Sequence, residues 1–256
     1  SSFIEGLRAS NKRVALAAYE PVAADSTARA VLGNVRAMEQ AVALGATDTA
    51  FQLDDLLAIH HTLLEGTSEQ RFAGRIREVQ NWIGGRGASP ADAAFIPPPP
   101  EHVHDLLEDL VAFVNLDDLP AIAQAAIAHA QFETIHPFAD GNGRTGRCLI
   151  HIILRRRGLA PRFVPPISVV LAGRARDYIA GLVDYRQDRI DDWTGAFASA
   201  TITASEAARQ LAQDLDQLVA RLTTQAGAPR SDSVARRIIA GLPAQPIVNA
   251  DPIASR

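Results

Sequence analysis

The stretch that decides the fold is His136-Pro-Phe-Ala-Asp140-Gly-Asn-Gly-Arg144-Thr-Gly-Arg147, which joins two segments of helical periodicity. Pro137 disfavours the α conformation at His136, so the first helix should end there and present the imidazole at its terminus. Gly141 and Gly143 allow a tight turn into a second helix, whose first N–H groups lack partners. Such a junction is a site for anions, most often phosphate.

Charged side chains in the same stretch suit a phosphorylated ligand. Arg144 and Arg147 lie on one face of the second helix, where both guanidinium groups can hold phosphate oxygens. Asp140 offers a carboxylate to a magnesium ion that keeps most of its waters. Together with His136 as a proton acceptor, these groups predict phosphoryl or nucleotidyl transfer. The alternative, a histidine that only caps a helix beside solvated arginines, leaves this combination unexplained.

Composition excludes several classes of protein. The chain has 256 residues, 47% of them hydrophobic and 21% charged, with a net charge of −4, and this is typical of a globular protein with a sizeable core. It contains no apolar run long enough to cross a bilayer, and its single cysteine, Cys148, excludes an internal disulfide. We therefore expect a cytoplasmic protein without membrane association. The acidic balance makes nucleic-acid binding by the chain as a whole an unfavourable hypothesis.

Helical periodicity dominates the rest of the chain, and the fold class is predicted to be all-α. The expected helices cover residues 26–44, with Ser26 as the N-cap, 54–64, 100–113, 120–135, 145–157, 174–186, 191–222 and 234–242. Residues 71–96 are rich in glycine and predict a loop or small hairpin. Residues 223–231 predict a linker.

The segment 136–147 matches, at every position, the Fic-domain signature histidine-x-phenylalanine-x-acid-Gly-Asn-Gly-Arg-x-x-Arg, so the chain resembles the Fic/DOC family. Residues 80–85 and 95–100 also resemble the flap hairpin of that family, and the helix order is similar over about residues 1–215. This resemblance implies a Fic-type helical bundle with a short β-hairpin flap. It also implies transfer of AMP from Mg-ATP to a hydroxyl group of a protein.

The resemblance further implies a role for each matching residue. His136 would be the catalytic base, Phe138 a core anchor, and Asp140 the ligand of Mg²⁺. Tyr178 would line the adenine pocket or, alternatively, serve as a core tyrosine. The implied positions for ATP, its phosphates and the target segment are Ile83, Gly84, Gly85, Asp140, Gly141, Asn142, Gly143, Arg144, Thr145, Gly146, Arg147 and Tyr178.

The N-terminal run Ser1-Ser-Phe-Ile-Glu5-Gly6 resembles the inhibitory motif of Fic proteins, Ser/Thr-x-x-x-Glu followed by Gly or Asn. The resemblance implies that Glu5 pairs with Arg147. That pairing would occupy the guanidinium that should hold the γ-phosphate, and ATP would then bind in a geometry unsuited to transfer.

These hypotheses divide the chain into a Fic domain at residues 1–222, with an inhibitory helix at 1–20 and a flap at 71–96, and a linker with the start of a truncated winged-helix module at 223–256. The expected partners are ATP and a target protein, which includes this chain itself; a homodimer is left open. Two alternatives remain at this point. One is a Fic protein that removes AMP or transfers another phosphate-containing group, and the other is a regulatory, DNA-associated protein.

Overall fold

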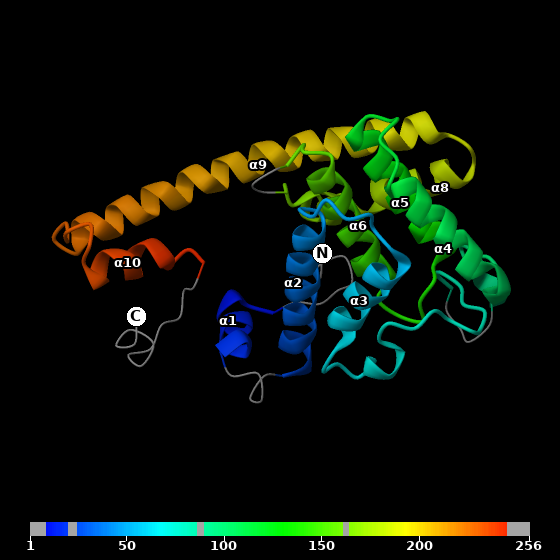
Figure 1. Cartoon of the computed structure of the whole chain (residues 1–256), viewed down its shortest axis with the longest axis horizontal. Helices are drawn as coiled ribbons and strands as arrows, with labels where there is room; N and C mark the ends of the chain where they lie inside the picture. The colour runs from blue at the N-terminus through cyan, green and yellow to red at the C-terminus, as the bar shows by residue number, and fades with distance from the viewer. Residues whose placement is uncertain (1–8, 20–24, 86–89, 161–163, 245–256) are drawn as a thin grey trace.

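The computed structural model describes residues 9–19, 25–85, 90–160 and 164–244, and in those ranges the protein consists of helices without β-strands (Figure 1). This confirms the predicted all-α class. The α-helices are α1 (Asn11–Tyr19), α2 (Ser26–Leu44), α3 (Leu53–Leu64), α4 (Pro100–Val114), α5 (Ala121–Ile135), α6 (Asn142–Arg156), α7 (Ile167–Gly173), α8 (Ala175–Arg186), α9 (Ile190–Gln225) and α10 (Val234–Gly241). Two short 3₁₀ helices cover Gln70–Phe72 and Pro90–Asp92.

Helices α5 and α6 form the centre of the molecule. They pack against each other, with α2 and α3 on the side of α6 and with α4, α8 and α9 around α5. The alanine-rich sequence of α5 is buried on most sides, and Phe132 is completely covered. Inside α6, the run from Cys148 to Leu154 is buried throughout. The junction between these two helices is therefore held by the core of the fold.

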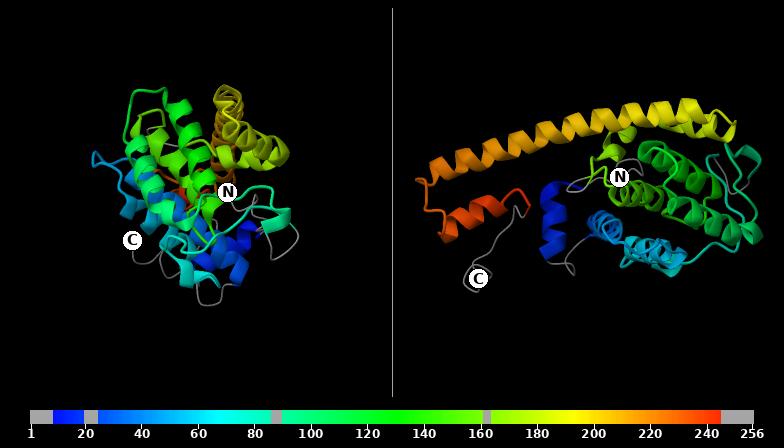
Figure 2. Two further views of the ribbon diagram at one scale, coloured as in Figure 1. Left: turned by 90° about the vertical axis from the view of Figure 1, so that its right-hand side faces the viewer. Right: turned by 45° about the horizontal axis from the view of Figure 1, so that its top comes forward.

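Helix α9 is much longer than the body it covers. Its first half packs on the core through Trp193 and Phe197, and the Trp193 indole N–H donates to the carbonyl of Ala126 at 2.8 Å. Its second half extends past the other helices, where α10 packs back against it (Figures 1 and 2). The helix continues to Gln225, three residues beyond the expected end of the Fic domain. The division into domains stays a prediction.

Helix ends are where the structure departs from the sequence predictions. The N-cap of α2 is Asp25 and not Ser26, because the Asp25 carboxylate accepts the N–H of Ala28 at 2.9 Å. Helix α6 begins at Asn142, three residues earlier than expected, because Gly141 adopts a left-handed conformation and starts the helix. Helix α7 was not predicted, since its seven residues are too few to show a period.

No helix in the described ranges has both the length and the apolar character required to cross a bilayer. The one cysteine, Cys148, is buried, and burial raises the pKa of its thiol to about 12. It is therefore a core residue and not a nucleophile.

Three histidines are buried in the core as neutral groups. Burial lowers the pKa of His60 to about 4, of His129 to about 3 and of His151 to about 4. Each value lies below the ordinary 6.5 of an unfolded chain, so the unfolded state binds protons first as the pH falls. The associated stability is fully present above about pH 6.5 and is lost as the pH falls to about 4 for His60 and His151 and to about 3 for His129.

We predict that the free energy of unfolding falls by about 1.4 kcal/mol per pH unit for each of these histidines between pH 6.5 and 4. His60→Asn removes one of these titrating groups. The dependence of the free energy of unfolding on pH should therefore decrease by about 1.4 kcal/mol per pH unit, whatever effect the substitution has on stability at pH 7. Urea unfolding at half-unit pH steps measures the slope. The matched control is His102→Asn, because His102 is exposed; a slope unaltered by His60→Asn would contradict a neutral His60.

Gly146 allows the close crossing of α5 and α6. A Cβ atom at this position would lie 2.7 Å from Cδ1 of Phe132 and 3.0 Å from Oε1 of Glu133, both on α5. Real side chains do not approach so closely, so even alanine would force the two helices apart. Although the resemblance placed Gly146 among the phosphate-binding positions, its observed surroundings are those of helix packing.

We therefore predict that Gly146→Ala destabilises the protein by about 1–3 kcal/mol, the usual cost of overpacking. Gly195→Ala is the matched control, because Gly195 also lies inside a helix but has nothing within 4 Å of an added Cβ. That control should stabilise the protein by about 0.5–1 kcal/mol through helix propensity. Urea denaturation of both variants tests the pair, and equal effects would refute the packing role.

Candidate active site

His136 terminates α5 in the predicted way. The helix ends at Ile135, and His136 follows in the left-handed conformation at φ 48° and ψ 59°, with its N–H donating to the carbonyl of Phe132 at 2.9 Å. Its side chain is 20% exposed, and Nδ1 lies 3.9 Å from Oε2 of the buried Glu133. A left-handed histidine costs about 1–2 kcal/mol. This strained conformation occurs at the residue where α5 ends and the imidazole projects from the helix.

The backbone of His136 is fixed by a buried arginine that the sequence did not single out. The Arg77 guanidinium donates to the carbonyl oxygens of His136 at 2.9 Å and Ile135 at 3.4 Å, and also to Val79 at 3.3 Å and Pro98 at 2.5 Å. Its own N–H donates to the carbonyl of Pro137 at 2.9 Å. Burial lowers its pKa from the ordinary value. A cation here also complements the negative C-terminus of α5.

Asn81 and Arg186 make further hydrogen bonds to backbone carbonyls at the end of α5 and in the loop that follows it. The Asn81 amide donates to the carbonyls of His136 at 3.3 Å and Phe138 at 3.1 Å. Arg186, on α8, lies over the ring of Phe95 with its guanidinium carbon 3.8 Å from the ring centre, and it donates to the carbonyl of Glu133 at 3.3 Å. The segments on both sides of residues 86–89 are thereby tied to the end of α5.

Phe138 anchors the loop, as the resemblance implied. Its ring is fully buried and stacks on the imidazole of His60, with centroids 3.7 Å apart and planes within 2°. His60 accepts the N–H of Gly74 on Nδ1 at 3.0 Å and donates from Nε2 to the carbonyl of Asp140 at 2.9 Å. Burial lowers the pKa of His60, while the bond to the Asp140 carbonyl acts in the opposite direction. The acceptor role of Nδ1 toward Gly74 requires the neutral ring that the lowered pKa provides.

Asn142 closes the loop from the other side. Its carboxamide accepts the N–H of Phe138 at 2.8 Å and donates to the carbonyl of the same residue at 2.7 Å. Gly141, at φ 81°, packs so closely on α3 that a Cβ would lie 3.1 Å from Leu63 and 3.3 Å from His60. The Asn142 side chain thus braces the loop, and only its backbone N–H remains for an anion.

The N-terminus of α6 brings together the groups on which the predicted anion site depends. Asn142, Gly143 and Arg144 form its first turn, whose N–H groups have no partner within the helix. The Arg144 guanidinium donates to Oδ2 of Asp140 at 2.9 Å, and its side chain is 7% exposed. Its buried Nε atom has no hydrogen-bond partner in the described part of the chain. Such an orphaned donor beside free N–H groups favours an anionic ligand.

Arg147 and Thr145 follow on the same helix and are buried. Arg147 is 1% exposed, so it is not a solvated surface arginine. The Thr145 hydroxyl is buried without a hydrogen-bond partner among the described residues. Burial, with the charge of Arg147 as a smaller contribution, lowers the pKa of His129 to about 3. The charge of Arg147 is thus felt by the buried His129 imidazole.

The flap consists of two segments joined by a single antiparallel bridge between Ile83 and Phe95. The Ile83 N–H donates to the Phe95 carbonyl at 2.9 Å, and Gly84 and Gly85 both have positive φ angles, 77° and 91°. The expected β-hairpin stays a prediction, because one bridge is not a pair of strands and residues 86–89 lie outside the described ranges.

Two other predicted residues have different outcomes. Tyr178 is 7% exposed, with its hydroxyl 2.9 Å from Nε2 of His129 and its ring packed near Trp193, as in the alternative of a core tyrosine. Glu5 lies outside the described residues. The described residues contain no group of three histidine, cysteine or acidic side chains that could hold a metal ion by themselves.

Sequence reasoning missed Arg77 and the full role of His60. The bond of His60 to Asp140 and the bonds of Arg77 to Ile135 and His136 join residues 58 or more positions apart in the chain. No local sequence spacing can therefore predict them. For His60 the only signal was its place among the apolar residues of 53–64, and the polar sequence around Arg77 gave no signal.

Residues 50–154 match the model of the Fic/DOC family. Among curated relatives, protein adenylyltransferase fic-1 of Caenorhabditis elegans is 31% identical over 161 residues, which are 58% of this chain and 30% of that protein. Protein adenylyltransferase Fic of Drosophila mojavensis is 32% identical over 151 residues, 54% of this chain and 28% of that protein. The chain thus spans about three tenths of the length of these relatives.

The fold is similar to two solved structures. A Fic family protein from Desulfovibrio desulfuricans G20 superposes with a TM-score of 0.66 at 26% identity, over 93% of this chain and 71% of that one. Residues 134–508 of C. elegans Fic-1 give 0.63 at 25% identity, over 82% and 61%. The segment that matches the Fic/DOC family model, residues 50–154, includes α3 to α6 and the whole loop between α5 and α6.

Proposed function

We propose that the protein is an adenylyltransferase that moves AMP from ATP to a hydroxyl side chain of a protein. The junction of α5 and α6 carries this proposal: a partly exposed imidazole, the free N–H groups of a helix N-terminus, and two buried arginines lie within twelve residues. The names of the relatives, protein adenylyltransferases, support the same reaction. The target protein and the modified hydroxyl are left open.

In this proposal, His136 takes the proton of the target hydroxyl as its oxygen attacks the α-phosphorus, and pyrophosphate leaves with the electron pair of the broken bond. An ordinary imidazole accepts a proton at neutral pH. The N–H groups of Asn142, Gly143 and Arg144, with the guanidinium groups of Arg144 and Arg147, stabilise the phosphate charge.

Asp140 fits the magnesium ion that accompanies ATP. Its side chain is 45% exposed, and the described contact engages only Oδ2, through Arg144. Mg²⁺ in nucleotide sites is commonly held by one or two carboxylates together with the substrate phosphates. A lone accessible carboxylate beside an anion site has that character, and the ion would arrive as part of the substrate.

We further propose that Glu5 restrains this site through Arg147. The buried position of Arg147 supports the idea, because a carboxylate paired with it would compete with phosphate in a region from which water is largely excluded. Homodimer formation and the lack of nucleic-acid binding remain predictions.

We expect Glu5→Gly to raise AMP incorporation by about 5–150-fold, the range of a coupling of about 1–3 kcal/mol. Incubation with α-labelled ATP and a cell lysate, followed by mass analysis of the labelled protein, measures both the rate and the group that is added. Addition of a group other than AMP would favour another Fic transfer reaction.

The control is the double variant Glu5→Gly with His136→Ala. It should lose about 10²–10⁴-fold of the incorporation while it still binds ATP, because removal of a general base leaves the phosphate contacts in place. Incorporation that persists in the double variant would assign the base elsewhere, and equal rates for the wild type and Glu5→Gly would refute the inhibitory role.

Arg77 has the contacts of a positioning residue for this reaction. It makes no described contact with the residues proposed to bind the phosphates, but its guanidinium donates hydrogen bonds to the backbone carbonyls of Ile135 and His136. A lysine cannot make these bonds with one planar group. Loss of the clamp should therefore displace the imidazole without altering the anion site.

We predict that Arg77→Lys, in the Glu5→Gly background, lowers kcat about tenfold while KM for ATP changes less than about threefold, since small misplacements of a reacting group have large effects on rate. Arg75→Lys is the control, because Arg75 is exposed two residues away. Initial rates over a range of ATP concentrations separate the two constants. A rise in KM with unchanged kcat would contradict the positioning role.

A further inference from the structure

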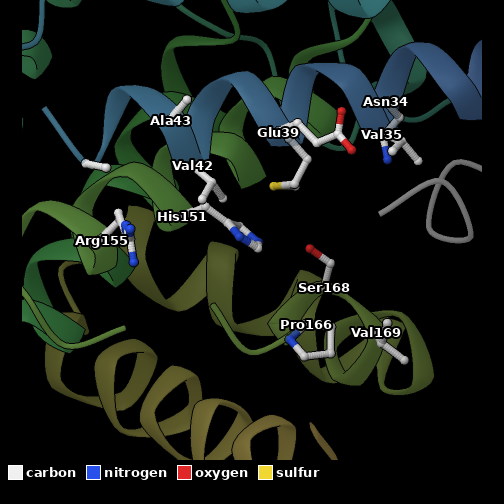
Figure 3. A pocket seen from close by; sticks show the side chains of 12 residues that line it. Asn34, Val35, Glu39, Val42, Ala43, His151, Arg155, Pro166, Ser168 and Val169 are labelled. Carbon is white, nitrogen blue, oxygen red and sulfur yellow. The ribbon is translucent and has the colours of Figure 1, made fainter. Parts of the chain in front are cut away.

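A cavity of about 540 Å³ lies between α2 and α7, over the middle of α6 (Figure 3). Helix α2 packs against α6 and α3, whereas α7 packs against α8 and α9, so the cavity occupies the place where these two groups of helices diverge. Its volume falls in the range of small-molecule sites. None of its lining residues belongs to the loop at 136–141.

Most of the wall is apolar. The apolar lining residues are Val35, Met38, Val42, Ala43, Ala46, Pro166 and Val169. Water against such a surface gains few hydrogen bonds, and an apolar ligand that displaces it is favoured. Met38 adds a flexible side chain that can adapt to different shapes.

Three polar side chains interrupt this apolar wall. Asn34 and His151 are 8% and 7% exposed, and Oδ1 of Asn34 and Nδ1 of His151 are buried without a hydrogen-bond partner in the part of the chain that the structure describes. Figure 3 shows the imidazole of His151 and the hydroxyl of Ser168 pointing into the same space. Buried polar atoms without partners are uncommon in native proteins, so they mark a place for a ligand with hydrogen-bonding groups.

The three buried polar side chains of the lining, Asn34, His151 and Ser168, carry no formal charge at neutral pH. Asn34 and Ser168 do not ionise, and burial lowers the pKa of His151 to about 4. The charged lining residues, Glu39 and Arg155, have opposite signs, and Glu39 is exposed. An ionised ligand would lose its hydration without a buried counter-charge, which disfavours it.

We propose that this cavity binds an uncharged, mainly apolar small molecule that donates a hydrogen bond to Asn34 or His151. This site is separate from the proposed ATP site, and its test does not depend on adenylyl transfer.

Indole is a suitable probe, because it has an apolar body and one N–H donor, and benzothiophene has nearly the same shape without the donor. Titration of the wild-type chain, followed by NMR of the valine methyl groups, should give saturable shifts at Val35, Val42 and Val169. Indole should bind about three- to tenfold more tightly than benzothiophene, the usual net effect of one hydrogen bond.

Four variants complete the test. Val42→Phe should fill the space and abolish binding of both probes, whereas Val183→Phe, at an exposed position of α8, should leave binding unchanged. Asn34→Leu should bring the affinity for indole close to that for benzothiophene, or His151→Phe should do so if the imidazole is the acceptor. Absence of saturable shifts, binding that survives Val42→Phe, or equal affinity of the two probes for the wild type would overturn the proposal.

Discussion

The connection between α5 and α6 constrains the rest of the structure, because it must bring the carbonyl end of one buried helix next to the N–H end of another within six residues, 136–141. The two helix termini carry partial charges of opposite sign, so each needs a different partner. Arg77 provides the cation for the end of α5, through the carbonyls of Ile135 and His136. The start of α6 is left to bind an anion. The fold thus separates the positive group that holds the histidine from the positive groups that would hold phosphate.

The loop is held by short-range and long-range contacts together. The Asn142 side chain closes the turn on Phe138 from within the loop, and His60 stacks on the same phenylalanine from α3. His60 also bonds the carbonyl of Asp140, which orients the peptide that leads into the left-handed Gly141. The proposed role of His136 as a catalytic base would benefit from this order, because the entropy cost of fixing the loop is met when the protein folds and not in each reaction.

The sequence was sufficient to predict the all-α class, the end of α5 and the position of the glycines and arginines at the start of α6, because each depends on residues that are neighbours in the chain. Pro137 and the glycines act on their own backbone, and Arg144 and Arg147 are related by the helical repeat alone. The helix start at Asn142 was misplaced by three residues because a left-handed Gly141 can begin a helix earlier than the periodic pattern shows. The Arg77 clamp depends on contacts across 58 or more residues, which only the tertiary structure brings together.

The polar residues of helix α6 differ between its first turns, which carry charged side chains, and its later turns, where the polar side chain is a neutral histidine. This difference argues for two separate functions. Its first turns carry Arg144 and Arg147 toward the loop, where positive charge is concentrated. One turn after Arg147 comes His151, which burial keeps neutral and which borders a mainly apolar cavity. Because an ionised ligand is favoured at the first place and disfavoured at the second, the same molecule is not suited to both.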